Sequence, residues 1–78
     1  MYVEINRRAR QAEARYGKFA STHEALGVAV EEWDELREAI GLNDLEAIEY
    51  EALDLAAVLV RLAQACRDGG DFQKRSVK

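Results

Sequence analysis

The sequence predicts an all-α protein built from three helices. Its 78 residues contain no proline, and helix-forming residues such as alanine, leucine, glutamate and arginine dominate. Apolar side chains recur every three or four residues, which is the period of an amphipathic helix. Glycines and capping residues divide this pattern, so we expect helices at about 3–16, 22–40 and 44–67, followed by a polar tail at 68–78.

The ends of the first two expected helices carry local signals. Gly17 follows the first helix and suits the left-handed conformation in which many helices end. Ser21 and Glu24 have the spacing of a capping box, which predicts the start of the second helix. We expect Trp33 at the centre of the buried face of this helix, and Gly41 at its end.

The third expected helix begins near Asn43 and is unusually apolar. A connection of about three residues makes the second and third helices antiparallel neighbours, a helical hairpin. From residue 52 to residue 63 the only charged side chains are Asp54 and Arg61, so we expect the third helix to be buried on all sides. A chain this short cannot cover such a helix alone, which predicts a helical-bundle homodimer or homotetramer.

Length and composition limit the number of domains and the cellular location of the protein. One domain spanning residues 1–78 is expected from the length. The single cysteine, Cys66, excludes an intrachain disulfide framework, favours a reducing compartment and is expected to be buried. No apolar run is long enough for a signal peptide or a bilayer span, so we expect a cytoplasmic protein without membrane contact.

Charge is segregated along the chain. Residues 1–20 hold five basic and two acidic side chains, residues 21–60 hold one basic and eleven acidic, and residues 61–78 hold five basic and two acidic. An acidic middle between basic ends suits a cation site flanked by groups that bind phosphates. Charge alone is more simply explained by a solvated helix surface whose ends attract its middle. Nucleic-acid binding is not expected, because the whole chain is acidic.

Two pairs of acidic residues have a spacing that brings carboxylates together. Glu32 and Glu35 lie three residues apart in the second expected helix, and so do Glu51 and Asp54 in the third, so each pair occupies one helical face. At a rise of about 1.5 Å per residue, the two pairs lie roughly 3 Å apart in height on the adjacent helices. Four carboxylates are therefore expected to converge. The alternative is a set of ordinary surface acids, for which this spacing is common.

A hard divalent cation would explain such a cluster. Ionised carboxylates in a partly dry place repel, so either their pKa values rise or a cation binds. Ligands that are all oxygen select Mg²⁺ first and Mn²⁺ second. Asp54 is the most informative residue, because it lies unpaired among apolar neighbours. An ion pair with Arg61 across a dimer is the alternative explanation for it.

The acidic pattern resembles that of the MazG-like, all-α nucleotide pyrophosphatase superfamily. The resemblance rests on Glu31–Glu35, followed fifteen residues later by Glu51–Asp54, and the segment Phe19–Leu36 is also similar to small phage-type members. It covers about residues 17–65. The chain departs from the family in having no lysine at 27–30 and no evident fourth helix.

The resemblance implies a reaction and roles for residues. Members cleave nucleoside triphosphates between the α and β phosphates with Mg²⁺, yielding a monophosphate and pyrophosphate. Carried over by position, the metal ligands would be Glu32, Glu35, Glu51 and Asp54. Glu31 or Glu35 would orient or deprotonate the attacking water.

Phosphate and base contacts are expected from basic and aromatic side chains. The candidates for substrate binding are Arg8, Arg15, His23, Lys74 and Arg75. Generic solubilising charge explains any one of them as well, and core packing is the simpler role for Trp33 and Tyr16. A non-enzymatic homodimeric helical module for interaction or regulation is the alternative function. It would share the fold but would gain no stability from Mg²⁺.

Overall fold

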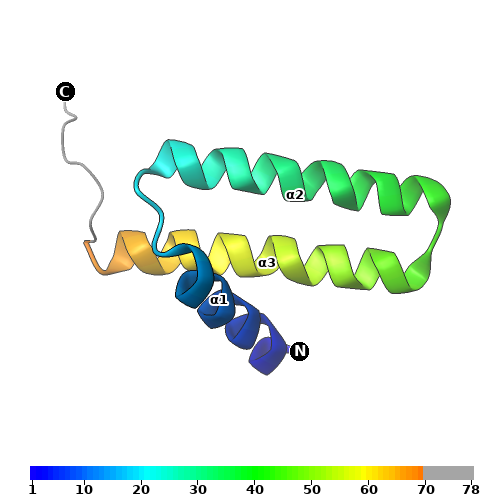
Figure 1. Ribbon diagram of the computed structural model, residues 1–78. Coiled ribbons are helices and arrows are strands. Elements are labelled where there is room, and N and C mark those ends of the chain that lie inside the picture. Colours follow the sequence, from blue (N-terminus) through cyan, green and yellow to red (C-terminus); the bar gives the residue numbers. More distant parts are fainter. Residues whose placement is uncertain (70–78) are drawn as a thin grey trace.

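The computed structural model describes residues 1–69 as three α-helices (Figure 1). These helices are α1 (Tyr2–Tyr16), α2 (Thr22–Leu42) and α3 (Leu45–Arg67), and the residues described contain no strand. The all-α, three-helix prediction is thereby confirmed. Figure 1 shows α2 and α3 lying side by side, joined at one end by a short turn, while α1 crosses α3 obliquely. Within residues 1–69, no helix combines the length and the apolar character that crossing a bilayer needs.

The end of α1 and the start of α2 follow their local signals. Gly17 has a φ of 83°, and its amide donates to the Glu13 carbonyl at 2.8 Å. The Ser21 hydroxyl accepts from the Glu24 amide at 3.0 Å, as predicted. The Glu24 carboxylate, however, accepts from the amide of Ala20 and not from that of Ser21. The cap therefore satisfies backbone donors on both sides of Ser21.

The turn between α2 and α3 corrects two predictions. Gly41 does not end α2, which continues to Leu42 and terminates at Asn43 in the left-handed conformation, with φ 55°. Asn43 therefore closes α2 and does not start α3. Asp44 starts α3, and its carboxylate accepts from the Ala47 amide at 3.1 Å. Asparagine tolerates the left-handed conformation well enough to take the role expected of glycine.

The core is small and lies where the α1–α2 connection meets α2 and α3. Phe19, which is only 5 % exposed, packs with Ala25 of α2 and Val58 of α3. Half-buried apolar side chains of α2 and α3 surround these three, namely Val28, Ala29 and Leu62. Most of the fully buried side chains are alanines, which lets the helix backbones approach closely.

The prediction that Trp33 centres the buried face of α2 is wrong for the single chain. Trp33 is 49 % exposed, whereas Ala25 and Ala39 are buried. Residues 25, 32 and 39 are spaced by seven and so share one helical face, which places Glu32 between the two buried alanines. A second apolar face of α2 stays exposed, formed by Leu26, Val30, Trp33 and Ile40.

Burial of Cys66 differs from expectation. Leu59 and Val60 of α3 are exposed in the single chain, as expected of a chain too short to cover this helix alone, and their burial in an oligomer stays a prediction. Cys66 is exposed as well, because it lies in the last turn of α3, beyond the core. The periodicity of α3 identified apolar positions correctly, but it did not reveal how far the other two helices cover them.

Arg61 fastens the α1–α2 connection to α3. Its side chain is only 6 % exposed, and its Nη2 donates to the Gly17 carbonyl at 3.1 Å. The guanidinium lies 4.0 Å from the centroid of the Phe19 ring, and the Glu13 carboxylate approaches Nε at 3.8 Å. Within one chain, Arg61 therefore has partners other than Asp54.

Replacing Arg61 with alanine is expected to lower the free energy of unfolding by about 2–4 kcal/mol, because the variant loses a charge-assisted hydrogen bond and a cation–π contact. Urea denaturation followed by circular dichroism measures this loss. Arg67→Ala, in the exposed last turn of α3, is the control and should change stability by less than about 0.5 kcal/mol. Equal stability of the two variants would contradict the role of Arg61.

Candidate metal centre

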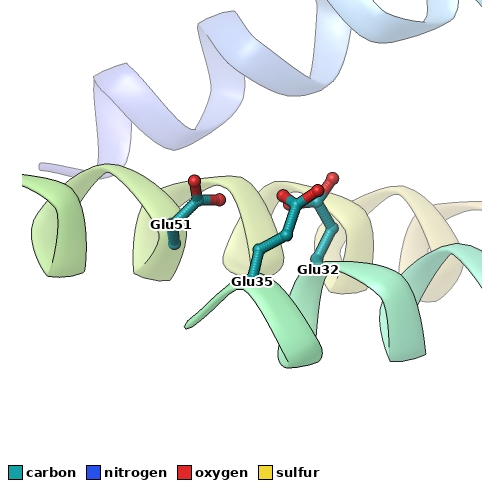
Figure 2. A group of neighbouring side chains, drawn as sticks. All are labelled: Glu32, Glu35 and Glu51. Atoms are coloured by element: carbon teal, nitrogen blue, oxygen red, sulfur yellow. The ribbon is translucent and has the colours of Figure 1, made fainter. Parts of the chain in front are cut away.

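Three glutamates from two helices converge on one another. Glu32 and Glu35 project from α2 and Glu51 projects from α3, and one carboxylate oxygen of each lies within 4.8 Å of the other two. Figure 2 shows the three carboxylates on the same side of the helix pair, with α1 passing on that side. The structure thus brings together three of the four acids singled out from the sequence.

Helix geometry explains this convergence. Glu32 and Glu35 share a face because they are three residues apart, and Glu32 belongs to the stripe that includes buried Ala25 and Ala39. The short turn at 43–44 sets the height of α3 against α2, so that the carboxylate of Glu51 lies close to those of the α2 pair. The helix period and the turn therefore bring these three negative charges together independently of any function.

Burial leaves part of this cluster without hydrogen-bond partners. Glu32 and Glu51 are half-buried, and Glu35 is exposed. The Oε1 atom of Glu32 and the Oε1 atom of Glu51 are each shielded from solvent and accept no hydrogen bond. A buried acceptor without a donor costs about 1–3 kcal/mol, and more when it carries charge. A proton or a bound cation would remove that cost.

The electrostatics of the cluster favour uptake of positive charge. Burial, followed by the charges of Glu35, Asp54 and Glu51, raises the pKa of Glu32 from 4.5 to about 7. Burial and the neighbouring Glu35 also raise the pKa of Glu51, while Arg8 acts in the opposite direction. Near neutral pH, Glu32 therefore tends either to keep a proton or to accept a cation, and the shift of Glu51 acts in the same direction.

Asp54 lies beside the three glutamates and has a partner. Its Oδ1 accepts from Nη1 of Arg8 at 2.6 Å, so the expectation that Asp54 is unpaired is wrong. Asp54 nevertheless raises the pKa of both Glu32 and Glu51, which places its charge next to the cluster. The sequence could not show this pairing, because Arg8 comes from the far end of the chain.

Arg8 is held in place by α1 and α3 together. Its Nε donates to the Glu4 carboxylate at 2.8 Å, and its Nη1 also donates to the Tyr50 carbonyl at 3.1 Å. The guanidinium lies 4.4 Å from the centroid of the Tyr50 ring, and the side chain is 16 % exposed. The sequence held one signal for this burial: Arg8 lies between Ile5 and Ala12, on the inward stripe of α1.

A cavity of about 490 Å³ adjoins the acidic cluster. Residues of all three helices and of the α1–α2 connection line it, with Glu31, Glu32 and Asp54 among the acids. Its basic lining residues are Arg8, Lys18 and Arg61. The cavity therefore combines carboxylates with cations, as a site for a metal-bound anion requires.

The other candidates for substrate binding lie elsewhere. Arg15 lines a neighbouring depression together with Tyr16 and Arg7. His23 is exposed in the first turn of α2 and does not line the cavity. Lys74 and Arg75 fall outside the described residues 1–69, so their predicted role stays a prediction.

The donor set fits a hard cation. All ligand atoms in the group are carboxylate oxygens, which Mg²⁺ and Mn²⁺ accept and softer metals bind poorly. The two shielded oxygens without donors are where a cation would replace a missing partner. Acidic clusters also occur without a bound ion, so this fit describes which kind of cation the carboxylate oxygens suit.

The raised pKa of Glu32 predicts a pH-dependent stability. With a folded-state pKa of about 7 against 4.5, the folded protein holds this proton more tightly than the unfolded chain. In chelator, the free energy of unfolding should therefore fall as the pH rises from 4.5 to 7, and Glu32→Gln should flatten this fall. Urea denaturation across this range is the measurement. Glu38→Gln, an exposed acid of α2, should keep the wild-type slope. Identical profiles for wild type and Glu32→Gln would refute the assignment.

Comparison with known proteins identifies no relative. No family model matches the chain, and no curated protein or solved structure matches it either. The resemblance of residues 17–65 to the MazG-like superfamily therefore stays a prediction from the sequence. The convergence of the carboxylates does not depend on that resemblance, because it follows from helix period, turn length and the contact between α2 and α3.

Proposed function

We propose that this protein is a cytoplasmic, Mg²⁺-dependent nucleoside triphosphate pyrophosphohydrolase that releases a nucleoside monophosphate and pyrophosphate. The convergence of Glu32, Glu35 and Glu51 from two helices, with two shielded oxygens lacking donors, is the observation that carries the proposal. The resemblance of the acidic pattern to the MazG-like superfamily supplies the reaction.

Each acid has a proposed task. Glu32, Glu35 and Glu51 would hold the cation, and Asp54 would join them as the fourth ligand. A bound Mg²⁺, or Mn²⁺ in its place, offsets negative charge on the phosphates and lowers the pKa of a coordinated water. Glu31, which lines the cavity, or Glu35 would accept the proton of the attacking water.

The neighbouring cavity is the proposed place for the nucleotide. Its volume of about 490 Å³ falls within the range typical of small-molecule sites. Lys18 lines it and is exposed, so it is available to meet phosphate charge. Arg8 is the other proposed phosphate contact, and it would first have to give up part of its contact with Asp54.

The proposed active form is an oligomer built on an antiparallel hairpin of α2 and α3. The exposed apolar face of α2 and the exposed Leu59 and Val60 of α3 support association, because contiguous apolar surface is costly in water. A homodimer or homotetramer that packs these faces together would form the helical bundle expected from the sequence.

The reaction is tested by measuring pyrophosphate release from a panel of nucleoside triphosphates with Mg²⁺. Loss of a residue that supports a metal ligand usually lowers activity about 10- to 100-fold. Glu51→Gln combined with Asp54→Asn removes two of the proposed ligands themselves, so it is expected to lower kcat/KM by more than this. Asp34→Asn combined with Glu49→Gln changes the same charge at exposed positions of the same helices and should retain activity. Wild-type turnover by the first variant would reject these ligands.

A non-enzymatic helical module is the second candidate function. The observation favouring it is again the exposed apolar face of α2, since such a face serves a partner whether or not chemistry occurs. This candidate expects association without any stabilisation by Mg²⁺. The enzyme expects both association and a melting temperature that rises with Mg²⁺, because the ion binds the folded state.

Association is tested by sedimentation equilibrium. Wild-type protein is expected to sediment as a dimer or tetramer, and Val30→Lys combined with Trp33→Lys should shift it to monomer, because two charges would be buried at the interface. Glu38→Gln, at an exposed position of α2 outside this apolar face, is the control. A monomeric wild type would contradict the proposed oligomer and the homodimeric module with it. If the wild type associates, thermal melts with and without Mg²⁺ decide between the two functions.

A further inference from the structure

Arg8 occupies the position of a cation at the edge of the acidic cluster. Its guanidinium lies 2.6 Å from Oδ1 of Asp54, which shares one face of α3 with Glu51 and lines the same cavity as Glu32. A positive group carried by α1 thus already neutralises part of the charge that a divalent ion would neutralise.

We propose that Arg8 is a tethered cation that competes with a divalent cation for Asp54, so that metal binding and the packing of α1 on α3 oppose each other. This inference rests on the proposed metal centre. It assigns to Arg8 a regulatory role in metal affinity, distinct from that of a ligand or a catalytic group.

Electrostatics and geometry both oppose simultaneous binding of Asp54 by the Arg8 guanidinium and by a divalent cation. Mg²⁺ binds carboxylate oxygens at about 2 Å and demands a regular arrangement of ligands around it. An ion held by Asp54 would therefore lie only a few ångströms from the guanidinium that binds the same carboxylate. Two positive charges at that separation repel, and the shielding of this region from water strengthens the repulsion. Asp54 therefore binds each of the two cations more weakly when the other is also bound.

The attachment of α1 is limited enough for this competition to matter. α1 packs on α3 and not on α2, and Ala9 is its one buried residue. Tyr2, Val3 and Tyr16 are exposed. Within residues 1–69, the hydrogen bonds that a side chain of α1 makes to α3 are those of Arg8 with Asp54 and with the Tyr50 carbonyl. Weakening the Asp54 contact should loosen α1.

Arg7 provides a matched control on the same helix. It is adjacent to Arg8 in the sequence and also binds the Glu4 carboxylate, at 2.6 Å, but it makes no contact with Asp54. Arg7→Gln and Arg8→Gln therefore remove the same charge from α1, and only the second frees Asp54. Any difference between the variants reports the contacts of Arg8 with Asp54 and Tyr50 and not the general charge of the helix.

Isothermal titration calorimetry with Mg²⁺, repeated with Mn²⁺, is the decisive experiment. Arg8→Gln should bind the cation more tightly than wild type, by a factor in the range of about 5 to 150 that is usual for coupling between two binding events. Arg7→Gln should stay within about twofold, as expected for an exposed ion pair. In chelator, Arg8→Gln should melt at a lower temperature than Arg7→Gln.

The outcomes separate the inference from the metal centre itself. Equal tightening in both variants, or unchanged or weaker binding in Arg8→Gln, overturns the competition while leaving the metal centre in place. Absence of binding in wild type and in both variants rejects the metal centre, and the competition with it. Binding by Arg8→Gln alone supports the competition in its strongest form.

A second measurement on the wild-type protein covers the case in which Arg8→Gln does not fold. Hydrogen exchange should show that added Mg²⁺ lowers the protection of amides in residues 5–12 of α1 and raises it in α2 and α3. Unchanged or increased protection in α1 overturns the inference. Arg8→Lys, which keeps the charge but has no planar fork to bind Asp54, Glu4 and Tyr50 together, should bind the cation with intermediate affinity.

Discussion

The crowding of carboxylates at the contact between α2 and α3 is the constraint on which the rest of the site depends. Helix period and a two-residue turn bring Glu32, Glu35 and Glu51 together, and burial then removes the water that would screen them. The raised pKa values and the shielded oxygens without donors are consequences of that single arrangement. The geometry of the cluster itself therefore penalises the ionised state of these carboxylates.

α1 places a positive charge beside this concentration of negative charge. Its inward stripe carries Arg8 in place of an apolar residue, and that guanidinium binds Asp54 at the margin of the cluster. The segregation of charge along the sequence thus has a direct structural expression, since part of the basic N-terminal segment neutralises part of the acidic middle. Ordinary charge attraction and preparation of a cation site, which were alternatives at the level of sequence, are both compatible with this one contact.

The small core has consequences beyond the site. Phe19, Ala25 and Val58 form its centre, and Arg61 closes it by binding the α1–α2 connection. This small core leaves the second apolar face of α2, formed by Leu26, Val30, Trp33 and Ile40, exposed to solvent. The single chain covers only the other apolar face of α2. A short chain with this distribution gains stability when another surface covers the second face.

The sequence alone determined the three helices, most of their ends and the convergence of three acids, because these depend on local capping, helix period and turn length. It misplaced the end of α2, since Gly41 and Asn43 both suit a helix end and only the folded turn selects one. The Arg8–Asp54 contact spans 46 residues and was decided by tertiary structure alone. So was the choice between the two apolar faces of α2, because periodicity marks a face as apolar without specifying which neighbour covers it.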